Sequence, residues 1–350
     1  MTIDLGFPSG LSLVPTTDES QRAKDFKSDQ EVRWCPGCGD YVVLNAMQAF
    51  LPSLGLRREN IVFVSGIGCS SRFPYYMNTY GMHSIHGRAP AIATGLAITR
   101  PDLSIWVVTG DGDALSIGGN HLIHALRRNV NLKILLFNNR IYGLTKGQYS
   151  PTSAEGTLTK STPMGSLDHP FNPLSLALGA EATFVARTLD NDRKQLTEIL
   201  TAAATHRGSA LVEIYQNCPI FNDGAFDVLK EPGHKEQRLI PLTHGEPIVF
   251  GTNDDHAVIR TDYGLDITKT ADLNPSDIVN HNTTLDDPSY AFALSRLSTQ
   301  DLGHAVTGIF RNTTRPTYDD AARAQTTHAT HTKPPNLQAL LDGNDTWTVS

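Results

Sequence analysis

Runs of apolar residues, many of them β-branched, recur along the first two thirds of the chain. Five runs have the length and composition of buried strands: residues 60–66, 103–113, 132–139, 182–187 and 210–217. Between them, residues 114–129 and 191–204 carry apolar side chains at helical spacing. Buried strands that alternate with helices are typical of a parallel sheet covered on both faces. The pattern therefore predicts an α/β fold with a doubly wound, mostly parallel sheet.

The two ends of the chain follow different patterns. Residues 1–30 predict a polar N-terminal arm, residues 31–230 the principal domain, and residues 231–350 an irregular C-terminal extension. Within the extension, residues 244–261 predict a short hairpin. From about residue 312 onward the chain is rich in Thr, Asp, His and Pro, which predicts a partly disordered tail with solvated histidines.

Composition narrows the class of protein. The 350 residues are 39% hydrophobic, enough for a sizeable core, and the formal net charge is −7. That charge argues against nucleic acid or an anionic membrane surface as the main partner. The sequence contains neither an apolar run near the roughly 20 residues that span a bilayer nor the pattern of a signal peptide. We therefore expect a cytoplasmic protein.

Thiol and polar side chains follow directly after several of the predicted strands. Cys69, the Gly-Asp loop at 110–113, the Asn pair at 138–139 and Cys218 each come just past a strand end. In open α/β sheets, ligands bind outside the carboxyl ends of the strands. We therefore expect these four features to converge at one edge of the sheet.

Two of these features predict a metal-diphosphate site. Asn139 follows Asp111 by 28 residues, an interval that holds one strand–helix–strand unit, so the two side chains should end neighbouring strands. Carboxylate, amide and carbonyl oxygens are ligands that Mg²⁺ prefers, with phosphate oxygens completing the shell. The glycines allow the backbone to approach a diphosphate, and a helix that opens near Ala114 would direct its N-terminus at the anion.

Longer stretches around these features resemble one enzyme family. The sequence GDGDALSIGGNHLIHALRRNVNLKILLFNNRIYGLTKGQYSPT resembles the thiamine diphosphate site of the β subunits of 2-oxoacid:ferredoxin oxidoreductases. WCPGCGD, SGIGCSSRFPYYMNTYGMHSIHGRAPAIATG and NCPIF resemble other signatures of that family, in the family's order, over about residues 31–225. LTKGQYSPTS and KSTPMGSLDHPFNP are most similar to the 2-oxoglutarate:ferredoxin oxidoreductase (2-oxoglutarate synthase) branch.

The resemblance implies a particular set of cofactor contacts. Asp111 and Asn139 would bind Mg²⁺ through their side chains and Ile141 through its carbonyl, while His86 would hydrogen-bond the diphosphate or the substrate. The remaining contacts with thiamine diphosphate are expected from three strand-end loops: Ile67, Gly68, Cys69, Ser70, Gly112, Asp113, Gly143 and Leu144.

The four cysteines are Cys35, Cys38, Cys69 and Cys218. The pair two residues apart could form a redox disulfide, half of a zinc site, or part of an iron–sulfur cluster. A thioredoxin-type pair needs no distant cysteine, and zinc knuckles usually combine two close pairs. Four thiolates from three strand-edge loops suit a [4Fe–4S] cluster, which the pattern favours over zinc or free thiols and which the resemblance also implies.

The resemblance implies oxidative decarboxylation of 2-oxoglutarate with coenzyme A, giving succinyl-CoA and CO₂, with electrons passing through the cluster to ferredoxin. Two alternatives remain open. The same chemistry could act on pyruvate or another 2-oxoacid. The chain could instead be an iron–sulfur electron-transfer or assembly protein without thiamine chemistry, although the intact GDGD and NN motifs argue against that.

Two further expectations concern a partner and a specificity residue. The family places the pyrimidine-binding domain on a larger α subunit, and neither end of this chain has the pattern of such a domain, so we expect an obligate complex, a dimer of heterodimers. Arg72 follows GIGCSS closely and predicts a guanidinium for the second carboxylate of 2-oxoglutarate.

Overall fold

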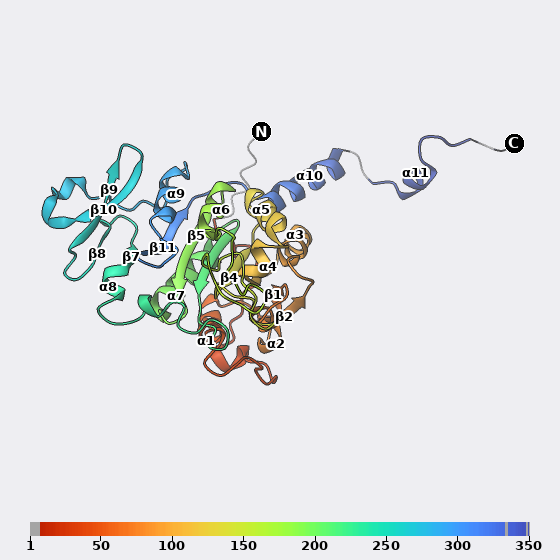
Figure 1. Ribbon diagram of the computed structural model, residues 1–350. Helices are drawn as coiled ribbons and strands as arrows, with labels where there is room; N and C mark the ends of the chain where they lie inside the picture. The colour runs from red at the N-terminus through yellow and green to blue at the C-terminus, as the bar shows by residue number, and fades with distance from the viewer. Residues whose placement is uncertain (1–7, 333–334, 348, 350) are drawn as a thin grey trace.

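An eight-stranded sheet runs through the middle of the protein, seen here in a computed structural model that describes residues 8–332, 335–347 and 349 (Figure 1). The strand order is β2-β1-β3-β4-β6-β5-β11-β7. The strands are β1 Ile61–Ser65, β2 Tyr80–His83, β3 Ser104–Gly110, β4 Lys133–Asn138, β5 Phe184–Leu189, β6 Ala210–Tyr215, β7 Leu239–Leu242 and β11 Ala305–Asn312. Neighbouring strands are parallel except β11 and β5, which are antiparallel. The predicted α/β fold with a mostly parallel sheet is confirmed.

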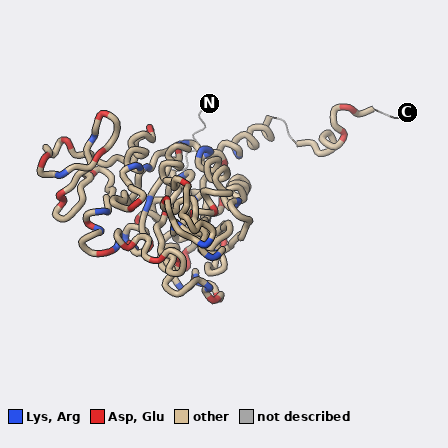
Figure 2. The backbone as a smooth tube through the Cα atoms, viewed as in Figure 1, with Lys and Arg blue, Asp and Glu red and all other residues tan. Residues whose placement is uncertain are grey.

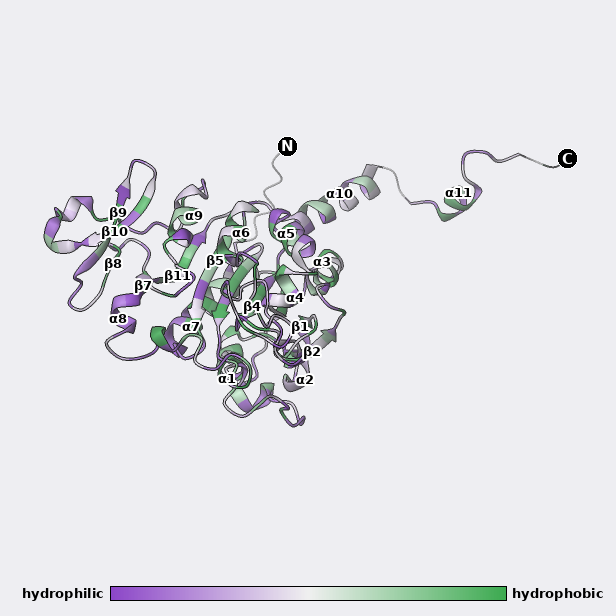
Figure 3. Cartoon of the chain, in the orientation of Figure 1, coloured by the Kyte–Doolittle hydropathy of each residue, from purple (hydrophilic) through white to green (hydrophobic). Residues whose placement is uncertain are grey.

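Helices connect and cover these strands. The α-helices are α1 Asp40–Phe50, α2 Phe73–Tyr76, α3 Ala89–Thr99, α4 Asp111–Leu115, α5 Gly119–Arg127, α6 Pro173–Gly179, α7 Arg193–Thr205, α8 Lys235–Arg238, α9 Ser289–Arg296, α10 Tyr318–Thr332 and α11 Leu337–Asp342. Side chains that alternate along a strand enter two different cores. In β3, for example, Ile105 and Val107 pack with α3, α5 and α6, whereas Trp106 and Val108 pack with α1 and α7. This alternation is why the central strands are apolar throughout, as the colouring of β4 shows (Figure 3).

The region after residue 230 contributes to both sheets. A small antiparallel sheet contains β8 Val249–Phe250, β9 His256–Thr261 and β10 Gly264–Lys269, and it lies to one side of the main sheet (Figure 1). The pairing of β8 with β9 confirms the hairpin predicted at 244–261. β7 and β11 were not predicted, and they extend the main sheet at the edge next to β5. The division into domains at residue 230 stays a prediction, but the main sheet draws strands from both sides of it.

The described parts of both chain ends contain more structure than the predicted polar arm and partly disordered tail. In the predicted arm, Phe26 and Val14 are buried in the core below α1, while residues 1–7 lie outside the described residues. At the other end, α10 forms where a partly disordered tail was expected. It packs against α3, where Arg323 donates to the Ala97 carbonyl at 2.9 Å, and the next helix, α11, lies apart from the body (Figure 1).

Along the backbone, Lys and Arg positions are interspersed with Asp and Glu positions, so that neither sign dominates the view in Figure 2. Among the described residues, no helix combines the length and the apolar character needed to cross a bilayer.

Candidate active site

The carboxyl ends of β1, β3 and β4 enclose a narrow cavity of about 60 Å³, called the cofactor pocket here. Its walls include every residue for which the sequence predicted a contact with thiamine diphosphate or with magnesium: Ile67, Gly68, Cys69, Ser70, His86, Asp111, Gly112, Asp113, Asn139, Ile141, Gly143 and Leu144. The strand order explains this convergence, because β1, β3 and β4 are neighbours and their loops share one edge. Arg72 does not line the pocket.

The Asp113 carboxylate holds the loops of this pocket together. Its Oδ1 accepts hydrogen bonds from the backbone amides of Ile67 (3.1 Å) and Gly87 (2.7 Å) and pairs with Nδ1 of His86. Its Oδ2 accepts a hydrogen bond from the Thr109 hydroxyl at 2.6 Å. The side chain is 1% exposed. Its oxygens are therefore occupied by protein donors, and the carboxylate shapes the pocket from behind.

His86 presents its second nitrogen to the cofactor pocket. Because Nδ1 is held by Asp113, Nε2 is the nitrogen that remains for a ligand. The imidazole side chain is 39% exposed, and its ring meets Tyr142 edge-on at 6.4 Å between centroids. Asp113 thus fixes the orientation of a histidine that can donate to or accept from a bound molecule.

Asp111 is anchored by two hydroxyls that the sequence analysis did not single out. Its Oδ2 accepts hydrogen bonds from Ser150 and from Thr152, the latter at 2.6 Å. Burial raises the pKa of Asp111 to about 6, although these hydroxyls oppose the shift. In the part of the chain that the structure describes, Asp111 forms no ion pair with Lys, Arg or His. A buried carboxylate of this kind is suited to a bound cation.

The donor set around Asp111 fits magnesium. Asp111 offers a carboxylate oxygen, Asn139 an amide oxygen and Ile141 a backbone carbonyl, and all three residues line the cofactor pocket. Asn139 Oδ1 accepts a hydrogen bond from the Ile141 amide at 3.1 Å, which fixes the loop that carries both residues. These are hard oxygen donors, and they could hold Mg²⁺ together with a diphosphate.

Tyr142 and Gly112 form the closed side of the pocket. The Tyr142 hydroxyl donates to the Gly112 carbonyl at 3.1 Å. A Cβ atom placed on Gly112 would lie 2.1 Å from the Tyr142 ring, so only glycine fits below the ring.

The four cysteines come from loops that meet beside the cofactor pocket. Cys35 and Cys38 form one turn, in which the Cys38 amide donates to the Cys35 carbonyl at 3.1 Å. This turn meets the Cys218 loop, since the Gly39 amide donates to the carbonyl of Asn217 at 3.0 Å. A Cβ atom on Gly143 would lie 3.4 Å from Sγ of Cys69 and 3.6 Å from Sγ of Cys218. Gly143 lines the cofactor pocket, so these thiols are its immediate neighbours.

The environment of the thiols argues against a catalytic redox pair. Burial, together with the nearby Asp40 carboxylate, raises the pKa of Cys69 to about 12, and burial holds the pKa of Cys38 well above its ordinary value. A catalytic redox thiol needs the opposite shift. All four cysteines are free thiols. Among the described residues, no group of three or more His, Cys, Asp or Glu side chains is placed so that it could hold a single metal ion. A cluster needs no such gathering, because each thiolate binds a different iron, so the four cysteines could hold a [4Fe–4S] cluster.

Comparison with known proteins identifies the family. Residues 66–214 match the family described as thiamine pyrophosphate enzyme, C-terminal TPP binding domain. The 2-oxoglutarate oxidoreductase subunit KorB of Mycobacterium tuberculosis is 71% identical over 339 residues, which cover 96% of this chain and 91% of that protein. The chain belongs to the KorB family of 2-oxoglutarate oxidoreductase subunits.

A more distant relative and one solved structure extend this result. The β subunit of 2-oxoacid:ferredoxin oxidoreductase 2 of Aeropyrum pernix is 44% identical over 199 residues, which cover 57% of this chain and 64% of that subunit. The 2-oxoglutarate:ferredoxin oxidoreductase from Magnetococcus marinus, solved with 2-oxoglutarate, coenzyme A and succinyl-CoA bound, aligns with a TM-score of 0.74 and 34% identity. That alignment covers 94% of this chain and 98% of the other. This KorB-family chain is therefore a subunit of an oxidoreductase and carries a thiamine diphosphate-binding domain.

Arg72 lies next to the cofactor pocket in sequence but is not part of its lining. Its Nε donates to the Tyr76 hydroxyl at 3.0 Å, and its charge opposes the rise in the pKa of Cys69. The guanidinium therefore lies near Cys69 and outside the lining of the cofactor pocket. Whether it reads the second carboxylate of 2-oxoglutarate stays a prediction.

Proposed function

We propose that this chain is the catalytic β subunit of a 2-oxoglutarate:ferredoxin oxidoreductase. The enzyme converts 2-oxoglutarate and coenzyme A to succinyl-CoA and CO₂, and the two electrons released reduce ferredoxin. The observation that carries the proposal is the single pocket that collects the glycine loop, the three oxygen donors and the edge of the cysteine cluster. The substrate follows from the KorB relative and from the solved relative that binds 2-oxoglutarate and coenzyme A.

In this proposal, Asp111, Asn139 and Ile141 hold Mg²⁺, which in turn holds the diphosphate. Thiamine diphosphate supplies, when bound, the electron sink that decarboxylation of a 2-oxoacid requires. The protein holds the groups that contact the cofactor in position. Asp113 fixes the Ile67 loop and the His86 ring, so that the polar groups of the pocket are arranged before a ligand arrives.

Cys35, Cys38, Cys69 and Cys218 are proposed to hold a [4Fe–4S] cluster, which would serve as a one-electron acceptor. The buried position of Cys38 and Cys218 excludes water from the ligands, and the exposed Cys35 leaves one side of the site near the surface. Ferredoxin would accept electrons at that side. Free thiols in this number suit a reducing compartment, and we place the enzyme in the cytoplasm.

The rim of the pocket supports a partner subunit. Leu144 (47% exposed) lines the pocket, Ile85 (69%) precedes the lining residue His86, and Ile117 (52%) lies against Gly87, which follows His86. Exposed apolar groups gathered at a functional site are typical of an interface. We propose that a larger α subunit covers this rim, supplies the pyrimidine-binding domain and forms a dimer of heterodimers with this chain.

Steady-state turnover tests the proposal. The chain, purified without oxygen together with its α subunit, should reduce ferredoxin only when 2-oxoglutarate and coenzyme A are both present. Pyruvate should be a poor substrate, and the chain alone should be inactive. Comparable rates with pyruvate would move the assignment to the broader 2-oxoacid class named for the Aeropyrum pernix relative. Robust turnover by the chain alone would contradict the two-subunit proposal.

A further inference from the structure

A second cavity, of about 300 Å³, shares a wall with the cofactor pocket. Thr152 lines this cavity and donates a hydrogen bond to Asp111, which lines the cofactor pocket. The other walls come from the loop before α6, from β5 and β6, and from the loop that follows α9. None of its residues belongs to the predicted cofactor or cluster contacts.

The floor of this cavity is a buried ion pair with no net charge. Arg187 Nε donates to Glu213 Oε2 at 2.6 Å, and the two side chains are 1% and 0% exposed. Glu213 Oε1 accepts a hydrogen bond from Asn138 Nδ2 at 2.7 Å. Glu213 is the carboxylate in the lining, and both of its oxygens are already occupied. It therefore cannot neutralise further cations at the walls.

Two more arginines line the same cavity. Arg140 donates to the Gln300 carbonyl at 2.9 Å and lies 5.2 Å over the Phe226 ring, so its guanidinium is held in place. Arg296 is the last residue of α9. Within the described residues, neither arginine forms an ion pair. The lining therefore carries two positive charges in excess.

Three acidic residues adjoin lining residues in the sequence, Glu155, Asp168 and Asp301, and none of them lines the cavity. Asp168 accepts a hydrogen bond from the Tyr149 hydroxyl at 2.8 Å, and Asp301 accepts one from the Gly303 amide at 3.0 Å. Neither carboxylate lines the cavity. Ser298, in contrast, adds a donor. Its hydroxyl oxygen accepts hydrogen bonds from Arg187 and from the Val306 amide, which leaves its proton for a further acceptor.

We propose that this cavity binds a small dianion with carboxylate or phosphate oxygens. A guanidinium donates two parallel hydrogen bonds to either group, and two guanidiniums match two charges. At roughly 30 Å³ per water molecule, the volume corresponds to about ten waters, enough for a short dicarboxylate or a phosphate ester. The site lies outside the cofactor pocket, and its occupation requires neither magnesium nor thiamine diphosphate.

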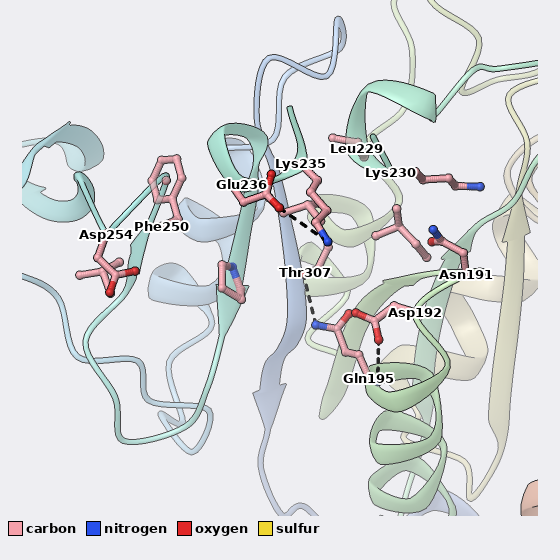
Figure 4. Close-up of a pocket in the computed structure, with 15 residues that line it drawn as sticks. Asn191, Asp192, Gln195, Leu229, Lys230, Lys235, Glu236, Phe250, Asp254 and Thr307 are labelled. Carbon is pink, nitrogen blue, oxygen red and sulfur yellow. Dashed lines mark hydrogen bonds and ion pairs between the residues drawn. The ribbon is translucent and has the colours of Figure 1, made fainter. Parts of the chain in front are cut away.

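Another cavity provides a contrast. It measures about 530 Å³ and lies between α7, α8 and β8 (Figure 4). Its cations are neutralised, because Lys235 pairs with Glu236 at 3.6 Å and Lys230 with Asp190 at 2.8 Å. Asp192 and Asp254 add negative charge to the lining. An anion is not expected there, so charge distinguishes the two cavities more clearly than size does.

Titration calorimetry on the full chain, without magnesium or cofactor, tests the site. The probes are succinate and inorganic phosphate, with acetate as the monoanion. We expect one saturable site for at least one dianion, and comparison of the two probes identifies which oxygen chemistry the site prefers. Arg296→Gln and Arg140→Gln should each weaken binding about tenfold or more.

Arg57→Gln is the matched control, because Arg57 is exposed and precedes β1 at the opposite edge of the sheet. It should bind the dianion like the unmodified chain. Arg296 is itself exposed, so its variant is expected to fold, which thermal unfolding verifies. Absence of saturable binding by both dianions would overturn the proposal. So would an equal loss in all three variants, or equal affinity for acetate.

Discussion

Nδ1 of His86 and Oδ1 of Asp113 form a hydrogen bond at the wall of the cofactor pocket. The same Oδ1 atom also accepts the backbone amides of Ile67 and Gly87, so one carboxylate sets the position of two loops and one ring. Gly66 is part of this arrangement, because a Cβ atom there would lie 1.9 Å from Asp113 Oδ2. Asp113, which was predicted to line the diphosphate, is the group that holds Ile67, Gly87 and His86 in position.

Asp113→Asn should lower both stability and cofactor affinity. An amide cannot accept from all of these donors, since its NH₂ group faces one of them, and a buried donor left without an acceptor costs about 1–3 kcal/mol. We expect the free energy of unfolding to fall by that amount and thiamine diphosphate binding to weaken in parallel. Denaturant unfolding and cofactor titration measure the two effects. Asp266→Asn, at an exposed carboxylate in β10, should change neither; an unchanged Asp113→Asn protein would refute the role given to this carboxylate.

Asp111→Ala and Asn139→Ala should weaken Mg²⁺-dependent thiamine diphosphate binding while the fold persists. Each substitution removes one oxygen donor, and the loss of a bond to a charged group typically costs about 1.5–3 kcal/mol, or roughly 10- to 150-fold in affinity. Titration of thiamine diphosphate at fixed Mg²⁺ gives the affinity. Thr152→Val should show a smaller loss, because it removes only one of the two hydroxyls that orient Asp111. Wild-type affinity in both alanine variants would exclude the assigned magnesium ligands.

The strands that the sequence predicted are those buried on both faces. β1, β3, β4, β5 and β6 are buried along almost their whole length, so their composition reveals them. β2 is exposed throughout, at the sheet edge, and resembles a loop in composition. β11 contains Gly308 at φ +110° and a register shift between Ile309 and Arg311, features that break a strand pattern. α10 has few apolar residues, and its Asp320 pairs with Arg207, a contact between distant parts of the sequence that only the folded chain brings together.

The functional site also contains some residues that the sequence could predict and others that it could not. Residues that follow strand ends, such as Asp111 and Asn139, could be predicted because strand order alone places them at one edge. The side chains that hold these residues in place could not be predicted. Ser150 and Thr152 reach Asp111 from a loop about 40 residues later, and no periodicity reports the path of that loop. The Tyr142 ring over Gly112 is a contact of the same kind.

Gly143→Ala should separate cluster assembly from folding. The added Cβ would lie 3.4 Å and 3.6 Å from the sulfur atoms of Cys69 and Cys218, distances that the free thiols tolerate. It would, however, fill space beside both thiolates that a cluster needs. We expect the Gly143→Ala variant to unfold like the unmodified protein. Its iron content should be lower than that of the unmodified protein, which is expected to contain about four irons per chain. Gly95→Ala is the control, because a Cβ atom there meets no neighbour within 4 Å. Full iron content in Gly143→Ala would contradict this geometry.

Lys133 provides a test of pH dependence away from the active site. It is buried at the start of β4, its Nζ donates to Asn131 Oδ1 at 2.6 Å, and burial lowers its pKa to about 7. Because the unfolded chain keeps the ordinary pKa of 10.5, it binds more protons than the folded chain between pH 7 and 10.5. This group therefore makes the folded state more stable as pH rises through that window.

Lys133→Met should remove this dependence. We expect the variant to be more stable than the unmodified chain by about 1–4 kcal/mol near pH 7, with the difference shrinking as the pH approaches 10.5. Denaturant unfolding at several pH values measures it. Lys269→Met, at an exposed position at the end of β10, should follow the unmodified chain at every pH. A constant difference between Lys133→Met and the unmodified chain would show that Lys133 does not titrate in this range.

Electron paramagnetic resonance shows whether one chain joins a thiamine diphosphate site to an iron–sulfur cluster. The complex with the α subunit is purified without oxygen, and spectra are recorded before and after adding 2-oxoglutarate and then coenzyme A. We predict a reduced-cluster signal that requires 2-oxoglutarate and thiamine diphosphate, that is lost in Asp111→Ala, and that disappears when oxidised ferredoxin is added. A chain that contains zinc and no iron would exclude the proposed cluster. A cluster that 2-oxoglutarate does not reduce would show that the two sites are not coupled.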